Sequence, residues 1–170
     1  IDADFSGKGY DLRTTEKNIQ LYNQLSGRAG RFSNDSIIIY QTINPNHQVL
    51  KDVLENNPER FFLNELKLRK ENNLPPFSRL ISLIISSNSK EYSYKGAIEI
   101  KKKIEPLNNV QILGPVESPI LKKKKKFRTR LLIRSSIKNV CQIQLAKILG
   151  NLKISSKIKL TVDVDPINFA

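Results

Sequence analysis

The sequence predicts two parts, an α/β segment over residues 1–74 and an α+β domain over residues 75–170. Two observations predict this division. The double proline Pro75-Pro76 interrupts any regular element. The balance of charge also changes there, because residues 1–74 hold 10 basic and 10 acidic side chains, whereas residues 75–170 hold the other 19 basic and 6 acidic ones. The whole net charge of +13 therefore belongs to the second part, which points to a polyanionic partner.

The first part is expected to hold three helices and one strand. Apolar residues at helical spacing indicate a helix over residues 14–30, and a β-branched and aromatic run over residues 36–42 favours a short buried strand. A helix around residues 47–55 follows, with His47 at its start. The next helix begins at Asn57, which can cap it, and ends near residue 72. The side chains expected to face inward are Leu21, Tyr22, Leu25, Ala29, Phe61, Phe62 and Leu66.

The basic part shows elements in the order β-α-β-β-α-β. The clearest strand is the last, because its apolar residues alternate with polar ones. This order is that of split-βαβ, ferredoxin-like folds, which have a four-stranded antiparallel sheet and two helices on one face. The expected strands cover residues 80–86, 110–113, 127–133 and 158–164, and the expected helices cover residues 89–105 and 136–150, with Ser136 and Gly150 as caps.

Composition argues against several classes of protein. No apolar run approaches the roughly 18 residues that a membrane-spanning helix needs, and no secretory leader opens the chain. The single cysteine, Cys141, allows no internal disulfide and no multi-cysteine zinc site, and we expect it in the core. The chain begins at Ile1 and contains no methionine, which indicates a fragment of a longer protein. We therefore expect a cytoplasmic protein without a membrane partner.

An arginine- and glycine-containing stretch ends the first predicted helix. It reads Gln24-x-x-Gly27-Arg28-x-Gly30-Arg31. Two arginines three residues apart lie on the same side of a helix, and glycines let a phosphate or another backbone approach closely. Forked guanidinium groups neutralise the charge that develops on a transferring phosphate. On spacing alone, a plain surface helix end is an equally good interpretation.

A dense basic cluster lies where a loop becomes the third strand of the basic part. Period-two alternation puts Lys126, Arg128 and Arg130 on one face of that strand and Phe127 on the other. Phosphate contacts of this kind give salt-sensitive binding that ignores base sequence. A solvated basic face without a partner is the alternative. The seven candidate residues for binding DNA or a protein partner are Lys122, Lys123, Lys124, Lys125, Lys126, Arg128 and Arg130.

The succession of motifs resembles a known family. The stretch from Gln24 to Arg31 is similar to the sixth motif of superfamily-2 helicases, and its flanks resemble the C-terminal part of the PriA family, the bacterial primosomal proteins N′. The flanking stretches are Asp11-Leu12-Arg13-x-x-Glu16, Gln41-Thr42-x-x-Pro45-x-His47, Phe61/Phe62-x-x-Glu65-Leu66-x-x-Arg69, Leu74-Pro75-Pro76-Phe77, Leu113-Gly114-Pro115 and Asp163-Val164-Asp165-Pro166.

The resemblance implies a parent that is a 3′ to 5′ DNA helicase of the replication-restart primosome. Residues 1–74 would be the end of its second motor lobe with linking helices. Gln24 would line the nucleotide cleft, Arg28 would contact the γ-phosphate region, and Arg31 would be the arginine finger. The parent would use ATP and Mg²⁺ and bind zinc upstream. The chain itself has no phosphate-binding loop, so we expect it to bind no cofactor and to be inactive alone.

The resemblance also implies partners for the basic domain. These are single-stranded and forked DNA, the single-stranded DNA-binding protein and other primosome proteins. Lys126 and Arg130 would then contact either DNA or an acidic protein tail, while Thr129 stands where the family has an aromatic residue, so base stacking is not expected there.

Other interpretations stay open. They are a non-enzymatic ribosomal-type RNA-binding protein and another superfamily-2 helicase. The pair Asp163 and Asp165 suggests structural ion pairing rather than a metal site.

Overall fold

The computed structural model describes residues 11–29, 37–55, 57–123, 125–138 and 141–169. The chain divides into two compact units, residues 1–68 and 69–170, and this division falls inside a helix a few residues before the double proline. Among the described residues, no helix combines the length and the apolar character that crossing a membrane requires.

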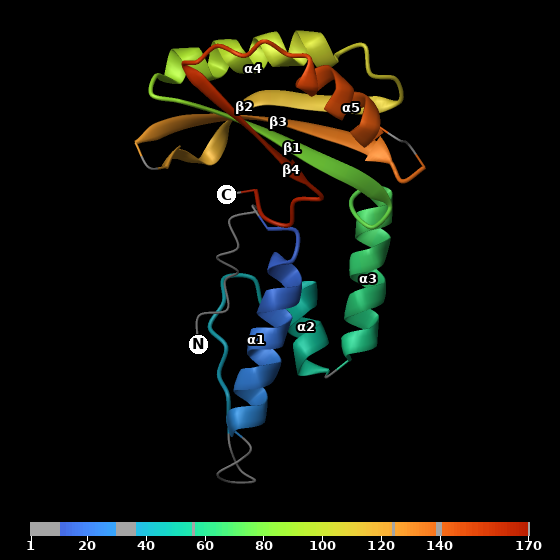
Figure 1. Ribbon diagram of the computed structural model, residues 1–170. Helices are drawn as coiled ribbons and strands as arrows, with labels where there is room; N and C mark the ends of the chain where they lie inside the picture. The colour runs from blue at the N-terminus through green and yellow to red at the C-terminus, as the bar shows by residue number, and fades with distance from the viewer. Residues whose placement is uncertain (1–10, 30–36, 56, 124, 139–140, 170) are drawn as a thin grey trace. The chain divides into compact units, whose positions relative to one another are not determined.

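The first unit is built from helices α1 (Thr14–Ala29) and α2 (Gln48–Leu54) and most of α3 (Pro58–Glu71) (Figure 1). The predicted starts of the last two are confirmed. The His47 side chain accepts a hydrogen bond from the Val49 N–H through Nδ1 (3.3 Å), and Asn57 Oδ1 accepts one from the Arg60 N–H (3.0 Å). Both side chains therefore satisfy a backbone donor that the first turn of a helix leaves open.

Two small apolar clusters hold these helices together. Tyr22 packs on Leu50, while Ile19 packs with Val49 and Phe61. The tyrosine ring also meets that of Tyr40 edge to face, with centroids 5.3 Å apart. Each cluster has only two or three buried members, so the described part of the first unit has no single extended core.

Several expectations for the first unit are wrong. Residues 37–40 are irregular and Gln41 forms an isolated bridge, so the described part of the predicted strand over residues 36–42 is not a strand. A strand needs a neighbouring strand along its length, and among the described residues of this segment pairing is limited to that bridge. Of the residues expected to face inward, Leu25 packs against the cluster of Tyr22 and Leu50, whereas Leu21, Phe62 and Leu66 are 51%, 50% and 43% exposed.

The second unit is an α+β domain with a four-stranded antiparallel sheet, as predicted. Its strands follow the order β2-β3-β1-β4, and α4 and α5 both lie on one face of the sheet (Figure 1). The elements are β1 (Ser78–Ser87), α4 (Lys90–Ile104), β2 (Val110–Lys123), β3 (Lys126–Ser136), α5 (Cys141–Gly150) and β4 (Ile158–Val164).

The core of the second unit lies between the sheet and the two helices. Leu83 of β1 stands opposite Leu131 of β3, and Ile81 stands opposite Ile133. Alternate residues of both strands therefore meet α4, where Ile100 and other apolar side chains are fully buried. The buried core consists of Ile81, Leu83, Ile85, Ala97, Ile100, Ile104, Leu107, Leu131, Ile133, Cys141 and Leu145.

Strand β2 was predicted to end before Gly114, but it continues to Lys123. The register shifts between Leu113 and Val116, which marks a bulge rather than an end. Gly114 has a φ of 95°, and a Cβ on it would lie 2.7 Å from the carbonyl oxygen of Arg130. The bulge therefore needs a residue without a side chain.

The described part of helix α5 begins at Cys141, whereas the sequence predicts a start at Ser136. Ser136 is not its cap, because this residue pairs with Ser78 and ends β3. Gly150 is the last helical residue and does not adopt the left-handed conformation expected of a cap. The expectation for Cys141 is confirmed, because it is 1% exposed and its thiol donates to Ser135 Oγ (3.2 Å).

Candidate functional site

One face of the sheet in the second unit points away from α4 and α5. Residues that stand opposite each other in neighbouring strands share a face, so Arg128, Ser86 and Lys159 form one row across the sheet. Arg130 and Ile84 lie in the next row, with Thr161 opposite. We call this surface the basic face and define it by Ile84, Ser86, Lys123, Lys126, Arg128, Arg130, Lys159 and Thr161.

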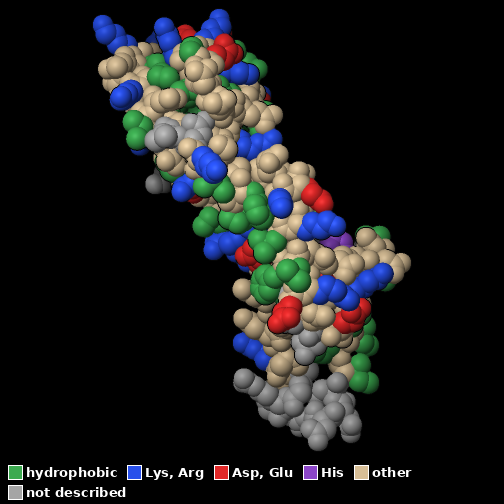
Figure 2. Space-filling model, turned by 90° about the vertical axis from the view of Figure 1, so that its right-hand side faces the viewer, with side chains coloured by type: hydrophobic (Ala, Val, Ile, Leu, Met, Phe, Trp, Pro, Cys, Tyr) green, Lys and Arg blue, Asp and Glu red, His purple; other side chains and the backbone are tan. Residues whose placement is uncertain are grey.

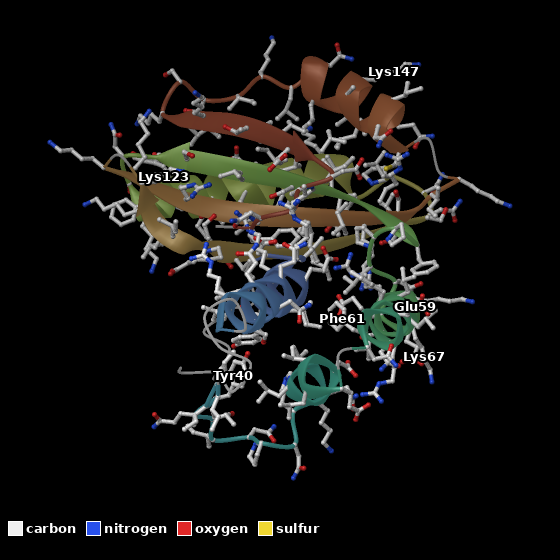
Figure 3. All side chains as sticks on the ribbon, turned by 90° about the horizontal axis from the view of Figure 1, so that it is seen from below. Tyr40, Glu59, Phe61, Lys67, Lys123 and Lys147 are labelled. Atoms are coloured by element: carbon white, nitrogen blue, oxygen red, sulfur yellow. The ribbon has the colours of Figure 1, made fainter. Side chains whose placement is uncertain are left out.

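A pocket of about 360 Å³ lies at one end of the basic face. Four cationic side chains and two hydroxyls line it, and none of its lining residues is an Asp or a Glu. Lys123, at the end of β2, lies at that end of the sheet in Figure 3. The lining residues are Ile84, Ser86, Lys123, Lys126, Arg128, Lys159 and Thr161.

The acidic side chains of the second unit pair mostly elsewhere. Arg79 contacts Asp165 (2.7 Å), Lys95 contacts Glu91 (2.7 Å), and Lys90 contacts Glu117. The ion pair predicted for Asp165 is thus confirmed, and the described residues contain no group of three or more His, Cys, Asp or Glu that could hold a metal ion. Figure 2 shows the many Lys and Arg side chains that remain on the surface of this unit.

Two of the three arginines of β3, Arg128 and Arg130, are buried. Arg128 and Arg130 are 9% and 5% exposed, and Arg128 Nη1 and Arg130 Nε have no hydrogen-bond partner among the described residues. Burial lowers the pKa of Arg130, and the positive charge of Arg128 lowers it further, while Asp163 acts in the opposite direction. The Arg130 guanidinium lies 5.7 Å from the centre of the Phe169 ring. Both groups therefore lie where an anion would be stabilised.

The predicted basic cluster divides between the two faces of the sheet. Lys126, Arg128 and Arg130 share the basic face, as the alternation predicted, and Lys123 joins them because it stands opposite Lys126. Lys122 instead stands opposite Phe127 on the other face, with its Nζ 5.1 Å from the ring centre. Lys125 occupies the turn with a φ of 65°, and Lys124 lies outside the described residues.

Two further residues near the site are Lys159 of β4 and Thr129 of β3. Lys159 was not predicted, although the alternation of β4 placed it among the polar positions of that strand. Thr129 is 3% exposed and hydrogen-bonds Ser93 on the helix side of the sheet. A base therefore cannot stack at this position.

The arginine motif of the first unit is described only in part. Gln24 and Arg28 lie one turn apart on α1 and both are exposed. Arg31 lies outside the described residues. Their roles toward a nucleotide stay predictions.

Comparison with known proteins identifies the relatives of this chain. The family model described as the primosomal protein N C-terminal domain matches residues 70–167, which include the whole basic face. The protein named replication restart protein PriA from Rickettsia prowazekii is 38% identical over 172 residues, covering 99% of this chain and 26% of the relative. Proteins of the same name from Borreliella burgdorferi and Bacillus subtilis are both 31% identical, covering 99% and 92% of this chain. The chain spans about a quarter of the length of the first relatives.

Proposed function

The chain belongs to the primosomal protein N C-terminal domain family, and from this premise we propose that its second unit binds the phosphate backbone of DNA in replication restart. The single observation that carries the proposal is the basic face. Lys123, Lys126 and Arg128 from one hairpin converge there with Lys159 from β4 on one pocket. Clustered cations of this kind attract phosphates strongly and carry no information about base sequence.

The first unit would serve the motor of a longer parent. We propose that the parent is an ATP-dependent 3′ to 5′ DNA helicase in which Gln24, Arg28 and Arg31 complete the site for ATP and Mg²⁺. The motif supports this role, and the exposure of Gln24 and Arg28 leaves both side chains accessible to a nucleotide. The same proposal includes a zinc site upstream in the parent and a cytoplasmic location. It also includes contacts with single-stranded DNA-binding protein and other primosome proteins.

The topology of the second unit supports a ferredoxin-like assignment. The element order β1-α4-β2-β3-α5-β4 and the sheet order β2-β3-β1-β4 are those of a split-βαβ domain. In this arrangement both helices lie on one face (Figure 1), and the pocket lies on the other.

Charge removal on the basic face tests the proposal. The double variant Lys123→Gln/Lys126→Gln changes two exposed side chains and should leave the fold intact. We expect weaker binding of single-stranded and forked DNA of any sequence. The slope of log K against log salt should flatten by about 1.4 to 1.8 if both lysines contact phosphates. Fluorescence anisotropy over a salt series measures both quantities.

The matched control is Lys147→Gln/Lys153→Gln, which removes the same charge from the helix side. Lys147 projects from α5 (Figure 3) and Lys153 follows that helix. The control should keep its salt slope. Equal losses in both double variants would mean diffuse attraction to net charge, and no loss in the first would exclude the basic face as the DNA site. Stronger binding of RNA than of DNA would favour the ribosomal-type alternative.

A further inference from the structure

Arg128 differs from the lysines around it because it is part of the pocket wall and yet is buried. Its side chain is 9% exposed, and its Nη1 atom is inaccessible and has no partner among the described residues. A buried donor without a partner destabilises the fold, and more strongly when it is charged. Because Arg128 lines the pocket, an anion bound there would supply the negative charge that the lining residues do not.

The surroundings of Arg128 match one small anion. Ser86 stands opposite Arg128 in the sheet, and Lys159 stands opposite Ser86, so a guanidinium, a hydroxyl and an ammonium follow one another in a single row. Thr161 adds a second hydroxyl. A tetrahedral phosphate oxygen set can accept from all of these donors, and the planar guanidinium can bind two oxygens at once.

The charge of the pocket is far above what a neutral or zwitterionic ligand would need. Four cations line about 360 Å³ and no lining residue offsets them. The nearest carboxylate on the same face, Asp163, stands opposite Ser82, beyond the row that holds Arg130. The lining residues therefore do not neutralise the positive charge of the pocket, and a bound anion would do so.

We propose that this pocket is a discrete site for one phosphate group of a DNA strand, with Arg128 as its bidentate ligand. The proposal rests on the proposed function and refines it. DNA would then make one geometrically defined phosphate contact in the pocket and less specific contacts with the exposed lysines. The phosphate group comes either from a strand end or from the internal backbone, and these two sources share the same binding chemistry.

The first experiment uses inorganic phosphate as the probe and the whole chain. Titration followed by ¹H–¹⁵N NMR should shift the Nε–H of Arg128 and the amides of Ser86 and Lys159 saturably. Sodium chloride at equal ionic strength should not reproduce these shifts. Shifts that follow ionic strength alone would overturn the proposal.

The second experiment tests whether the planar guanidinium of Arg128 binds two phosphate oxygens or contributes only a positive charge. Arg128→Lys keeps the charge and loses the fork, so it should weaken binding of a short oligonucleotide about tenfold or more. Lys159→Gln, on an exposed strand position, should weaken it as well and does not depend on the stability of the Arg128 variant. Lys147→Gln is the matched control. Binding unchanged in both variants would overturn the proposal.

Binding of two forms of one oligonucleotide shows whether the phosphate comes from a strand end or from the internal backbone. Tighter binding of the 5′-phosphorylated form than of the 5′-hydroxyl form, lost in Arg128→Lys, would assign the pocket to a strand end. Equal binding of both forms, weakened equally by the substitution, would assign it to the internal backbone. If Arg128→Lys has no effect while Lys123→Gln/Lys126→Gln still flattens the salt slope, the discrete pocket fails and the proposed function stands.

Discussion

The two units differ in how completely their apolar residues are covered. In the second unit each strand has at least one paired neighbour, and eleven buried side chains form one cluster between sheet and helices. In the first unit the clusters are small, and Ile37 and Ile39 are 85% and 75% exposed. An apolar pattern therefore predicts an element reliably only where the surface that it packs against belongs to the same unit.

The largest expected effect is the loss of stability when a core leucine is truncated in the second unit, compared with the same truncation in the first unit. Leu131→Ala removes a fully buried side chain from the centre of β3 and should cost about 2–5 kcal/mol, because the surrounding sheet and helix cannot collapse into the space. Amide hydrogen exchange resolved by residue measures the loss across the second unit.

Leu50→Ala is the matched truncation in the first unit. Leu50 is 4% exposed but, among the residues that the structure describes, shares its cluster with one other buried residue, Tyr22. The helices around it can close more easily, so we expect a loss of about 2 kcal/mol or less. Equal losses at the two sites would show that the first unit is as tightly packed as the second.

The fold of the second unit could be predicted because its patterns are local. Alternation in β1 placed Ile81, Leu83 and Ile85 on one side, and the structure buries all three. The extension of β2 beyond Gly114 could not be predicted, because the bulge depends on pairing with β3. The late start of α5 has the same origin, since Ser136 is held by a strand more than fifty residues earlier in the sequence.

The candidate site was predictable only along a single strand. Period-two alternation put Lys126, Arg128 and Arg130 on one face, and the register confirms it. Lys123 and Lys159 join them through strand order and register, which the patterns in single segments do not contain. The burial of Arg128 is likewise a property of the assembled sheet, so the sequence indicated a basic surface but not a pocket.

A second prediction compares two glycines with opposite structural requirements. Gly114→Ala would place a Cβ 2.7 Å from the Arg130 carbonyl at a φ of 95°. We expect a loss of about 1–3 kcal/mol and faster amide exchange across β2 and β3, because the bulge must open to admit the methyl group. An unchanged exchange pattern would mean that the bulge is not rigid.

Gly27→Ala should have the reverse sign. A Cβ at Gly27 meets no described atom within 4 Å, and the residue lies inside α1. Replacing a helical glycine with alanine should stabilise the first unit by about 0.5–1 kcal/mol. If the same substitution abolished ATP hydrolysis in a longer parent, Gly27 would be needed for close approach of a ligand and not for the fold of this unit.

The third prediction concerns charge at the start of α1. The Asp11 carboxylate accepts from the Arg13 N–H (2.8 Å) and pairs with Lys17, and the Lys17 hydrogen bond is the larger cause of its lowered pKa. Because the folded-state pKa lies below the ordinary 3.8, the stabilisation is full above that value and is lost as the pH falls through the lowered pKa. Asp11→Asn should therefore be less stable than the parent chain near neutral pH and equal to it in strong acid, measured by urea unfolding.

Glu91 of the second unit offers the same chemistry in a more exposed setting, and the effect expected there is the smallest. Its pKa is lowered chiefly by the hydrogen bond from Lys95, so the sign of the pH dependence matches that of Asp11. The two side chains of this pair are 70% and 66% exposed, however, whereas that of Asp11 is only 14% exposed. Water and salt screen an exposed pair, so Glu91→Gln should leave the urea midpoint unchanged within error at every pH and salt concentration. A clear loss that salt abolishes would show that α4 depends on this pair, and the contrast between a sheltered and an exposed carboxylate would then fail.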